Sequence, residues 1–220
     1  VGLAVMGENL ALNLEQKGYR VSLYNRLREN SPQAVDSFLA NKGKNKHFIG
    51  THSPKEFIES LKSPRKILLM IRAGHPVDEM ITTLLPFLKK GDTIIDGGNS
   101  DYRDTQRREN ELREKGIFFV GCGISGGEEG ALHGPSIMPG GSDEIKKEIL
   151  PVLQNIAVHL DDGTPCCSWI GPDGSGHFVK TVHNGIEYGD MQLIAEAYSL
   201  LNILQKGDHE ATAQTFESWN

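Results

Sequence analysis

Hydrophobic and polar positions follow two alternating periods along the first two thirds of the chain. Continuous or alternating apolar runs predict strands, because strands of a buried parallel sheet are apolar on both faces. Apolar positions three and four residues apart predict helices between these runs. The predicted strands cover residues 20–25, 66–71, 93–96 and 117–122. The predicted helices cover residues 8–18, 76–89 and 101–115, and two others begin at Ser31-Pro32 and Ser53-Pro54.

The succession of strand and helix predicts an α/β fold with a Rossmann-like, mostly parallel sheet and helices on both faces. The glycine-rich stretch 123–141 is predicted to be a functional loop. Beyond it the strand patterns stop, and a long helix is predicted over roughly residues 177–206, with another behind it. We therefore expect one domain over residues 1–173 and the start of an all-helical domain over residues 174–220.

Both ends of the chain indicate that the natural protein is longer. A glycine turn begins at Gly2, although the first strand of a Rossmann sheet normally precedes such a turn. Without that central strand, backbone groups on both of its neighbours would lack partners. Residues 216–220 still have the pattern of a helix interior. We therefore expect the natural chain to start earlier and to continue further.

The composition is that of an ordinary globular protein, with 38% hydrophobic and 24% charged residues among 220. A formal net charge of −6 argues against nucleic acid as a partner. No apolar run reaches transmembrane length and no secretory signal is evident, so we expect a cytoplasmic protein without a membrane partner. Cys122, Cys166 and Cys167 lack metal-ligand spacing and are predicted to be reduced thiols, with no metal site.

A dinucleotide fingerprint of the form G-x-A-x-x-G opens the chain. It consists of Gly2, Leu3, Ala4, Val5, Met6 and Gly7. Small residues let the backbone turn tightly and approach a pyrophosphate, which then rests on a helix N-terminus. A plain tight turn would look similar, but the helix that follows and the strand 20–25 at the expected distance favour a nucleotide site.

The strand after the fingerprint ends in Asn25 and Arg26. An NAD-specific site usually carries Asp or Glu here, about 20 residues after the fingerprint, to bind the ribose 2′-hydroxyl. A guanidinium instead pairs with a 2′-phosphate and stacks on adenine. Arg26 therefore predicts NADP as the cofactor, with Arg28 adding charge nearby; the alternative is a solvated surface arginine.

Two glycine-containing motifs follow predicted strands. The first, 96–100 (DGGNS), lies at a carboxyl end, where open α/β sheets bind ligands, and Asn99 offers both a donor and an acceptor. A structural turn would look similar. The second, 125–130 (SGGEEG), presents backbone amides suited to a carboxylate or phosphate, although Glu128 and Glu129 fit poorly beside an anion.

One face of the long predicted helix carries five functional side chains. They are Lys180, His183, Asn184, Glu187 and Tyr188, at spacings of i, i+3, i+4, i+7 and i+8. Charge pairs on a surface helix would produce part of this pattern. An amine, a carboxyl, an imidazole, an amide and a phenol together also supply an acid, a base and three orienting groups.

These motifs together resemble the 6-phosphogluconate dehydrogenase family, the decarboxylating enzymes of the pentose phosphate pathway. Related 3-hydroxyacid dehydrogenases share the fingerprint and a lysine in a similar place, but not the complete helix face. The resemblance implies NADP as cofactor, 6-phosphogluconate as substrate and a homodimer. The stretches that carry it span nearly the whole chain and read GLAVMG, DGGNS, GISGGEEGA, GPSIMPGG and HFVKTVHNGIEYGDMQLIAEAY.

The resemblance also implies a mechanism. Lys180 would remove the C3 hydroxyl proton as hydride moves from C3 to NADP, and the resulting 3-keto acid would lose CO2. Glu187 would protonate C1 of the enediol to give ribulose 5-phosphate. Further cofactor contacts would be Ile71, Arg72, Ala73 and Asn99. Substrate contacts would be Asn99, Ser125, Gly126, Gly127, His183, Asn184 and Tyr188, the last beside the phosphate.

The chain departs from the family pattern at a few positions. Leu27 stands where the family usually has Thr or Ser bonded to the 2′-phosphate, and Arg72 stands where it often has Lys. Family chains are also much longer, and their helical domain supplies further basic residues, some from the partner subunit. Two alternatives therefore stay open, a truncated NADP-binding module without catalytic activity and another 3-hydroxyacid dehydrogenase.

Overall fold

The computed structural model describes residues 1–26 and 33–220. The chain divides into two compact units, Val1–Lys180 and Thr181–Asn220. The strands are β1 (Val21–Tyr24), β2 (Phe48–Thr51), β3 (Lys66–Leu69), β4 (Thr93–Asp96), β5 (Phe118–Ser125) and β6 (Ser136–Gly141). The helices are α1 (Val5–Gln16), α2 (Ala34–Ala40), α3 (Pro54–Ser60), α4 (His75–Leu84), the 3₁₀ turn η1 (Leu85–Phe87), α5 (Tyr102–Arg113), α6 (Gly127–His133), α7 (Asp143–Ile156), α8 (Ser175–Leu204) and α9 (His209–Trp219).

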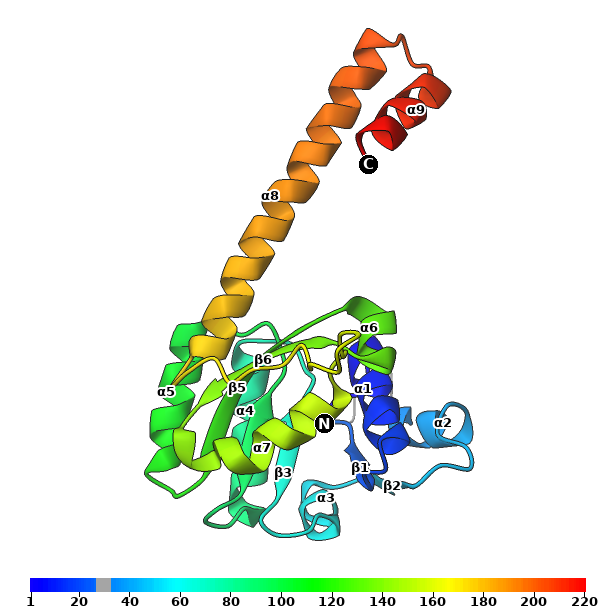
Figure 1. The fold of residues 1–220 in the computed structure, drawn as a ribbon. Helices are drawn as coiled ribbons and strands as arrows, with labels where there is room; N and C mark the ends of the chain where they lie inside the picture. The colour runs from blue at the N-terminus through cyan, green and yellow to red at the C-terminus, as the bar shows by residue number, and fades with distance from the viewer. Residues whose placement is uncertain (27–32) are drawn as a thin grey trace. The chain divides into compact units, whose positions relative to one another are not determined.

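The first unit is built on two groups of strands with helices around them (Figure 1). Strands β1 and β2 pair in parallel, and a four-stranded sheet has the order β3-β4-β5-β6. Within that sheet β3, β4 and β5 are parallel and β6 is antiparallel to β5. The prediction of a Rossmann-like, mostly parallel sheet is therefore confirmed.

Successive residues of β4 and β5 point to opposite faces, and each face has its own core. Ile95 and Val120 pack in a cluster with apolar side chains of α1 and α7. Ile94 and Phe119 pack in a second cluster with those of α3, α4 and α5. Helices therefore cover both faces of the sheet, as the apolar runs predicted.

The first residues of the chain lie between the edges of β1 and β3. The Val1 nitrogen donates to the Leu68 carbonyl at 2.7 Å, and Met70 N–H donates to the Val1 carbonyl at 2.8 Å. On the other side Gly2 N–H donates to the Tyr24 carbonyl at 3.0 Å. These bonds continue the ladders of both strands, as a strand between them would.

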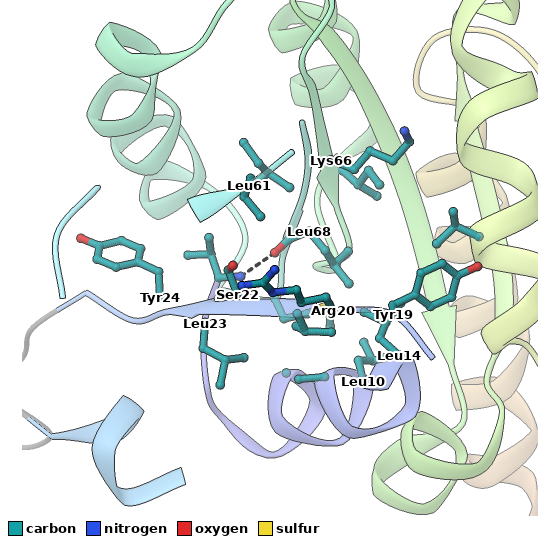
Figure 2. Close-up of a pocket in the computed structure, with 18 of the residues that line it drawn as sticks. Leu10, Leu14, Tyr19, Arg20, Ser22, Leu23, Tyr24, Leu61, Lys66 and Leu68 are labelled. Atoms are coloured by element: carbon teal, nitrogen blue, oxygen red, sulfur yellow. Dashed lines mark hydrogen bonds between the residues drawn. The ribbon is translucent and has the colours of Figure 1, made fainter. Parts of the chain in front are cut away.

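Behind Val1 the same gap opens into a cavity of about 560 Å³. Figure 2 shows that its walls are largely apolar and come from β1, β3, α1 and the segment after α3. The labelled lining residues include Leu10, Leu14, Leu23, Leu61 and Leu68.

The prediction that residues 123–141 form a loop is wrong. Strand β5 runs on to Ser125, helix α6 follows, and β6 returns antiparallel beside β5. Ile124 and Ile137 face each other in that pairing and are buried. Strand β2 and helix α7 were also not among the predicted elements. The helix start expected at Ser31-Pro32 lies outside the described residues, whereas the one at Ser53-Pro54 is confirmed, since Ser53 Oγ accepts from Glu56 N–H at 3.2 Å.

The second unit contains the later turns of α8 and helix α9. The Asp208 carboxylate caps α9 by accepting from Ala211 N–H at 3.0 Å. Thr212 Oγ1 donates to Gln205 Oε1 at 2.6 Å and links the turn to α9. The helices predicted over 177–206 and behind them are confirmed. Among the described residues, none of the helices combines the length and apolar character that a membrane span requires.

Candidate active site

The fingerprint forms a tight turn at the start of α1, beside the end of β1. Gly2 has a φ of 90°, in the left-handed region, and Leu3 N–H donates to Asn25 Oδ1 at 3.1 Å. A Cβ on Gly7 would lie 1.9 Å from the Gly2 carbonyl oxygen, so only glycine fits there. Helix α1 begins without a side-chain cap at Ala4, which leaves its first amides available to an anionic group. The turn is thus built as a dinucleotide-binding turn requires.

Arg26 lies directly beyond β1, beside the fingerprint. Its guanidinium Nη1 donates to Glu79 Oε2 of α4 at 2.5 Å, and both side chains are roughly half exposed. Asn25 Nδ2 donates to the Arg26 carbonyl at 3.2 Å. Leu27 and Arg28, the neighbouring positions expected to affect a 2′-phosphate, lie outside the described residues.

The structure brings two further predicted cofactor segments next to the fingerprint. A Cβ on Gly2 would lie 2.8 Å from Ile71 Cγ2, and one on Gly98 would lie 3.0 Å from the Ile71 carbonyl oxygen. The segment 71–73 thus runs between the fingerprint and the loop that carries Asn99. Arg72 and Asn99 are both exposed at this carboxyl edge of the strands. The fingerprint, Ile71 and the loop with Asn99 therefore lie next to one another.

A buried carboxylate organises the loop that carries Asn99. Asp96 ends β4 with no exposed surface. Its Oδ1 accepts from Gly98 N–H at 3.1 Å, and its Oδ2 accepts from Ser100 Oγ at 2.6 Å. Both ends of the short loop are therefore held by one side chain, which fixes the backbone on either side of Asn99.

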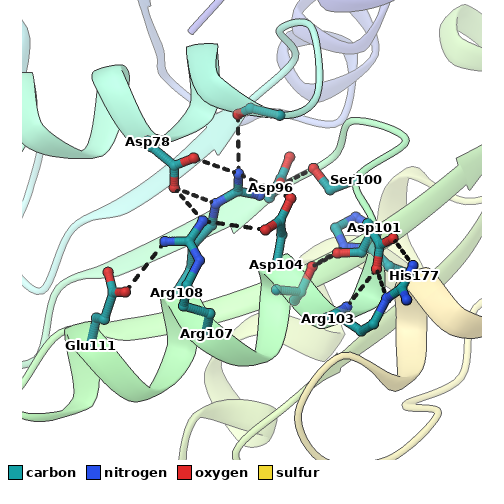
Figure 3. Close-up of polar contacts among 12 residues, drawn as sticks. Asp78, Asp96, Ser100, Asp101, Arg103, Asp104, Arg107, Arg108, Glu111 and His177 are labelled. Atoms are coloured by element: carbon teal, nitrogen blue, oxygen red, sulfur yellow. Dashed lines mark hydrogen bonds and ion pairs between the residues drawn. The ribbon is translucent and has the colours of Figure 1, made fainter.

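Arg108 of α5, which is 1% exposed, joins this loop to the start of α4 (Figure 3). Its Nε and Nη2 donate to the two carboxylate oxygens of Asp78 at 2.8 and 3.0 Å. Nη2 also donates to the Gly74 carbonyl at 3.0 Å, and Nη1 lies 3.7 Å from Asp96 Oδ2. The hydrogen bond from Arg108 is the main reason that the pKa of Asp78 falls to about 2. One guanidinium therefore connects the segments next to Ala73 and Asn99.

Lys180 is buried in the first turns of α8, 7% exposed. A Cβ on Gly123 of β5 would lie 2.6 Å from Lys180 Cβ, so this glycine permits the close contact of helix and strand. One turn earlier, His177 Nδ1 and Thr105 Oγ1 of α5 lie 2.7 Å apart (Figure 3). Burial lowers the pKa of His177, and the charge of Asp96 opposes that effect. These contacts fix the start of α8 on the sheet.

Ser125, Gly126 and Gly127 lie at the carboxyl end of β5, two to four residues beyond the glycine that contacts Lys180. Gly126 and Gly127 are exposed and have φ values of 141° and 59°. Glu128 and Glu129 are exposed in the first turn of α6. The predicted substrate loop therefore lies at the same edge of the sheet as the predicted cofactor segments.

The other members of the predicted helix face lie in the second unit, Thr181–Asn220. His183 Nδ1 lies 3.6 Å from Glu187 Oε2 and 3.2 Å from Asn184 Oδ1. Tyr188 is 69% exposed. The helical spacing of these four residues is confirmed, because all lie in α8. Their convergence with Lys180 on one substrate stays a prediction.

Sequence reasoning missed Arg108, Asp78, Thr105 and His177. Arg108 lies in the charged run of α5, where nothing in the pattern separates a buried guanidinium from exposed ones. His177 gave a weak signal, since it lies one helical turn before Lys180 on the same helix. In the part of the chain that the structure describes, no group of His, Cys, Asp and Glu side chains is arranged to hold a metal ion.

Comparison with known proteins identifies two family models in the chain. Residues 1–171 match the NAD binding domain of 6-phosphogluconate dehydrogenase, and residues 176–220 match the 6-phosphogluconate dehydrogenase C-terminal domain. The decarboxylating 6-phosphogluconate dehydrogenases of Ovis aries and Chlamydia muridarum are 53% and 56% identical to it over 220 residues. Each match covers 100% of this chain and 45% of the relative, so the chain spans less than half of these relatives.

Solved structures give the same relationship. Plasmodium falciparum 6-phosphogluconate dehydrogenase, described in its apo form and in complexes with NADP+ and with 6-phosphogluconate, matches with a TM-score of 0.89 and 42% identity. That match covers 100% of this chain and 46% of the other. Mycobacterium tuberculosis 3-hydroxyisobutyrate dehydrogenase has a TM-score of 0.74 at 22% identity over 93% of this chain and 64% of its own, a likeness of fold alone. The chain therefore belongs to the 6-phosphogluconate dehydrogenase family.

Proposed function

We propose that this protein catalyses the NADP-dependent oxidative decarboxylation of 6-phosphogluconate to ribulose 5-phosphate, CO2 and NADPH. The family membership supports this activity, as do the ligands of the Plasmodium falciparum structure, NADP+ and 6-phosphogluconate. The observation that carries the proposal is the placement of Lys180, buried against Gly123 at the edge where the predicted nucleotide and substrate loops end.

The residues at the carboxyl edge of the strands suit NADP, which would act as the hydride acceptor. The space that a Gly7 side chain would fill is closed by backbone, and the uncapped start of α1 offers amides to a pyrophosphate. Arg26 supplies the cation for a 2′-phosphate. The residues that would hold the cofactor are Gly2, Leu3, Ala4, Val5, Met6, Gly7, Asn25, Arg26, Leu27, Ile71, Arg72, Ala73 and Asn99.

Lys180 would act as the base that removes the C3 hydroxyl proton of the substrate. A base needs a fixed position within hydrogen-bonding reach of the proton it takes. The Thr105–His177 contact and the glycine under Lys180 provide such a fixed backbone. Glu187 would then donate a proton to C1 after CO2 has left.

Seven residues are proposed to contact the substrate. Asn99, Ser125, Gly126 and Gly127 offer an amide, a hydroxyl and backbone N–H groups that suit hydroxyl and carboxylate oxygens. His183 and Asn184 would orient the sugar acid, and Tyr188 would lie by its phosphate. Residues 1–173 would form the NADP-binding domain and residues 174–220 the start of the helical domain. The active form would be a cytoplasmic homodimer whose partner subunit supplies further basic groups.

The test is the absorbance of NADPH on mixing the protein with 6-phosphogluconate and NADP, alongside a calorimetric NADP titration. We expect both cofactor binding and turnover from a protein that includes the complete helical domain. Absence of turnover in that protein would refute the proposed activity.

Two other functions make different predictions in the same assays. A non-catalytic NADP-binding module would bind NADP without turnover. Another 3-hydroxyacid dehydrogenase would oxidise a non-phosphorylated hydroxy acid better than 6-phosphogluconate, and the likeness of fold to 3-hydroxyisobutyrate dehydrogenase makes this worth measuring.

A further inference from the structure

The proposed 2′-phosphate ligand, Arg26, already has a carboxylate partner from another element. Glu79 lies in the second turn of α4, and its Oε2 accepts from Arg26 Nη1 at 2.5 Å. Its other oxygen, Oε1, lies 3.3 Å from His75 Nδ1. The hydrogen bond from Arg26 is the main reason that the pKa of Glu79 is lowered. A negative charge therefore already pairs with the guanidinium that would bind the 2′-phosphate of NADP.

This position matters because NAD and NADP differ only at the 2′ position of the adenosine ribose. NAD-specific Rossmann sites put an Asp or Glu there to accept from the 2′-hydroxyl. In this chain β1 leads to Arg26 instead, but α4 brings a carboxylate to the same guanidinium. The site thus presents one group suited to each cofactor, a cation for the phosphate and an acceptor for the hydroxyl.

We propose that Glu79 is a specificity-determining residue that reduces the preference for NADP over NAD. The inference rests on the proposed function, in which Arg26 binds the 2′-phosphate. Glu79 competes with that phosphate for Arg26. Its carboxylate also repels the phosphate, which carries a charge of about −1.5 to −2. The 2′-hydroxyl of NAD, by contrast, gains an acceptor.

The experiment is a calorimetric titration of the wild-type protein and the Glu79→Gln variant with NADP and with NAD. A carboxylate and a phosphate that share one guanidinium in a solvent-exposed site repel each other weakly, so we expect NADP affinity to rise about three- to tenfold. Affinity for NAD should stay the same or fall. Raising the salt concentration should shrink the gain for NADP, because the effect is electrostatic.

Glu148→Gln is the matched control. Glu148 is 50% exposed and pairs with Lys66 at 3.3 Å, so the change removes the same charge from a similar ion pair. Lys66 begins β3, at the amino end of the strands, away from the cofactor edge. This control should leave both affinities unchanged. Glu79→Ala should act like Glu79→Gln and provides a second variant if one of them folds poorly.

The outcomes separate the two proposals. A wild-type protein that does not bind NADP at all would refute the proposed function. Normal NADP binding in the wild type, with no gain in both Glu79 variants or an equal gain for NAD, would overturn the role of Glu79 alone. A gain for NADP that exceeds the change for NAD, and that Glu148→Gln does not reproduce, supports it.

Discussion

Arg108 is an ionised side chain placed where the packing leaves almost no room for water. It is 1% exposed and lies between Asp78 and the fully buried Asp96. A buried ion pair adds little net stability compared with apolar residues, but removing one partner leaves an uncompensated charge. Its importance could not be read from the sequence, because α5 contains several arginines in one charged run and burial depends on which side meets the sheet.

Arg108→Ala should lower the free energy of unfolding by about 3–5 kcal/mol, because Asp96 would keep its burial and lose its cation. The measurement is urea denaturation at neutral pH. Arg103→Ala on the same helix is the control, since Arg103 pairs with Asp101 on the surface at 73% exposure and its loss should change the stability far less. Similar losses for both variants would contradict the role given to Arg108.

His177 should make stability depend on pH. Burial lowers its folded-state pKa from 6.5, so below pH 6.5 the unfolded chain binds a proton that the folded chain refuses. The contribution is therefore complete above pH 6.5 and is lost progressively as the pH falls below that value. We expect the melting temperature to drop from about pH 7 to pH 5, and His177→Gln to reduce that slope. An unchanged slope in the variant would assign the pH dependence to other groups.

Lys180→Ala should abolish turnover of 6-phosphogluconate while leaving NADP affinity nearly unchanged. The expected loss is at least about a hundredfold, the usual minimum for removing a general base. NADPH formation and NADP titration on the same preparation give the two quantities. Equal loss of both would mean that the buried lysine mainly supports the fold.

At the scale of elements, the start of α8 packs directly on β5 because Gly123 has no side chain there. A larger residue than Gly123 would collide with Lys180, so this glycine marks a place where a helix and a strand come into close contact. The glycine-rich composition of this region led to the wrong prediction of a loop over 123–141. The strand predicted over residues 93–96 from its apolar side chains, by contrast, matches β4 residue for residue.

Gly123→Ala should displace the first turns of α8, because its Cβ would lie 2.6 Å from Lys180 Cβ. Overpacking of this kind costs about 1–3 kcal/mol of stability, and turnover should fall further as the lysine moves. Gly130→Ala in α6 is the matched control. Its Cβ would meet only one atom, at 4.0 Å, so it should be neutral or slightly stabilising. Thermal melts and initial rates distinguish the two outcomes.

At the scale of the whole molecule, sequence patterns were sufficient for the fold class and the order of the main elements. They also placed the motifs 96–100 and 125–130 at the ends of strands, as β4 and β5 show, whereas the roles of the residues in these motifs stay predictions. They were insufficient for contacts between elements distant in sequence, such as those of Glu79 with Arg26 and of Arg108 with Asp96. Those contacts depend on tertiary packing, which no local pattern encodes.

The pairing of the strands has a consequence for the exchange of backbone amide hydrogens. Among the described strands β1 and β2 pair only with each other, and Val1 and Gly2 supply the backbone hydrogen bonds that link β1 to β3. A two-stranded sheet is marginal by itself, so its amide hydrogens should exchange with solvent deuterium faster than those of β4. NADP would bridge Arg26 on one side and the loop with Asn99 on the other, and should slow exchange at Ser22 and Leu23. Hydrogen–deuterium exchange with and without NADP measures this, and equal protection of both strands without the cofactor would show that the smaller sheet does not open separately.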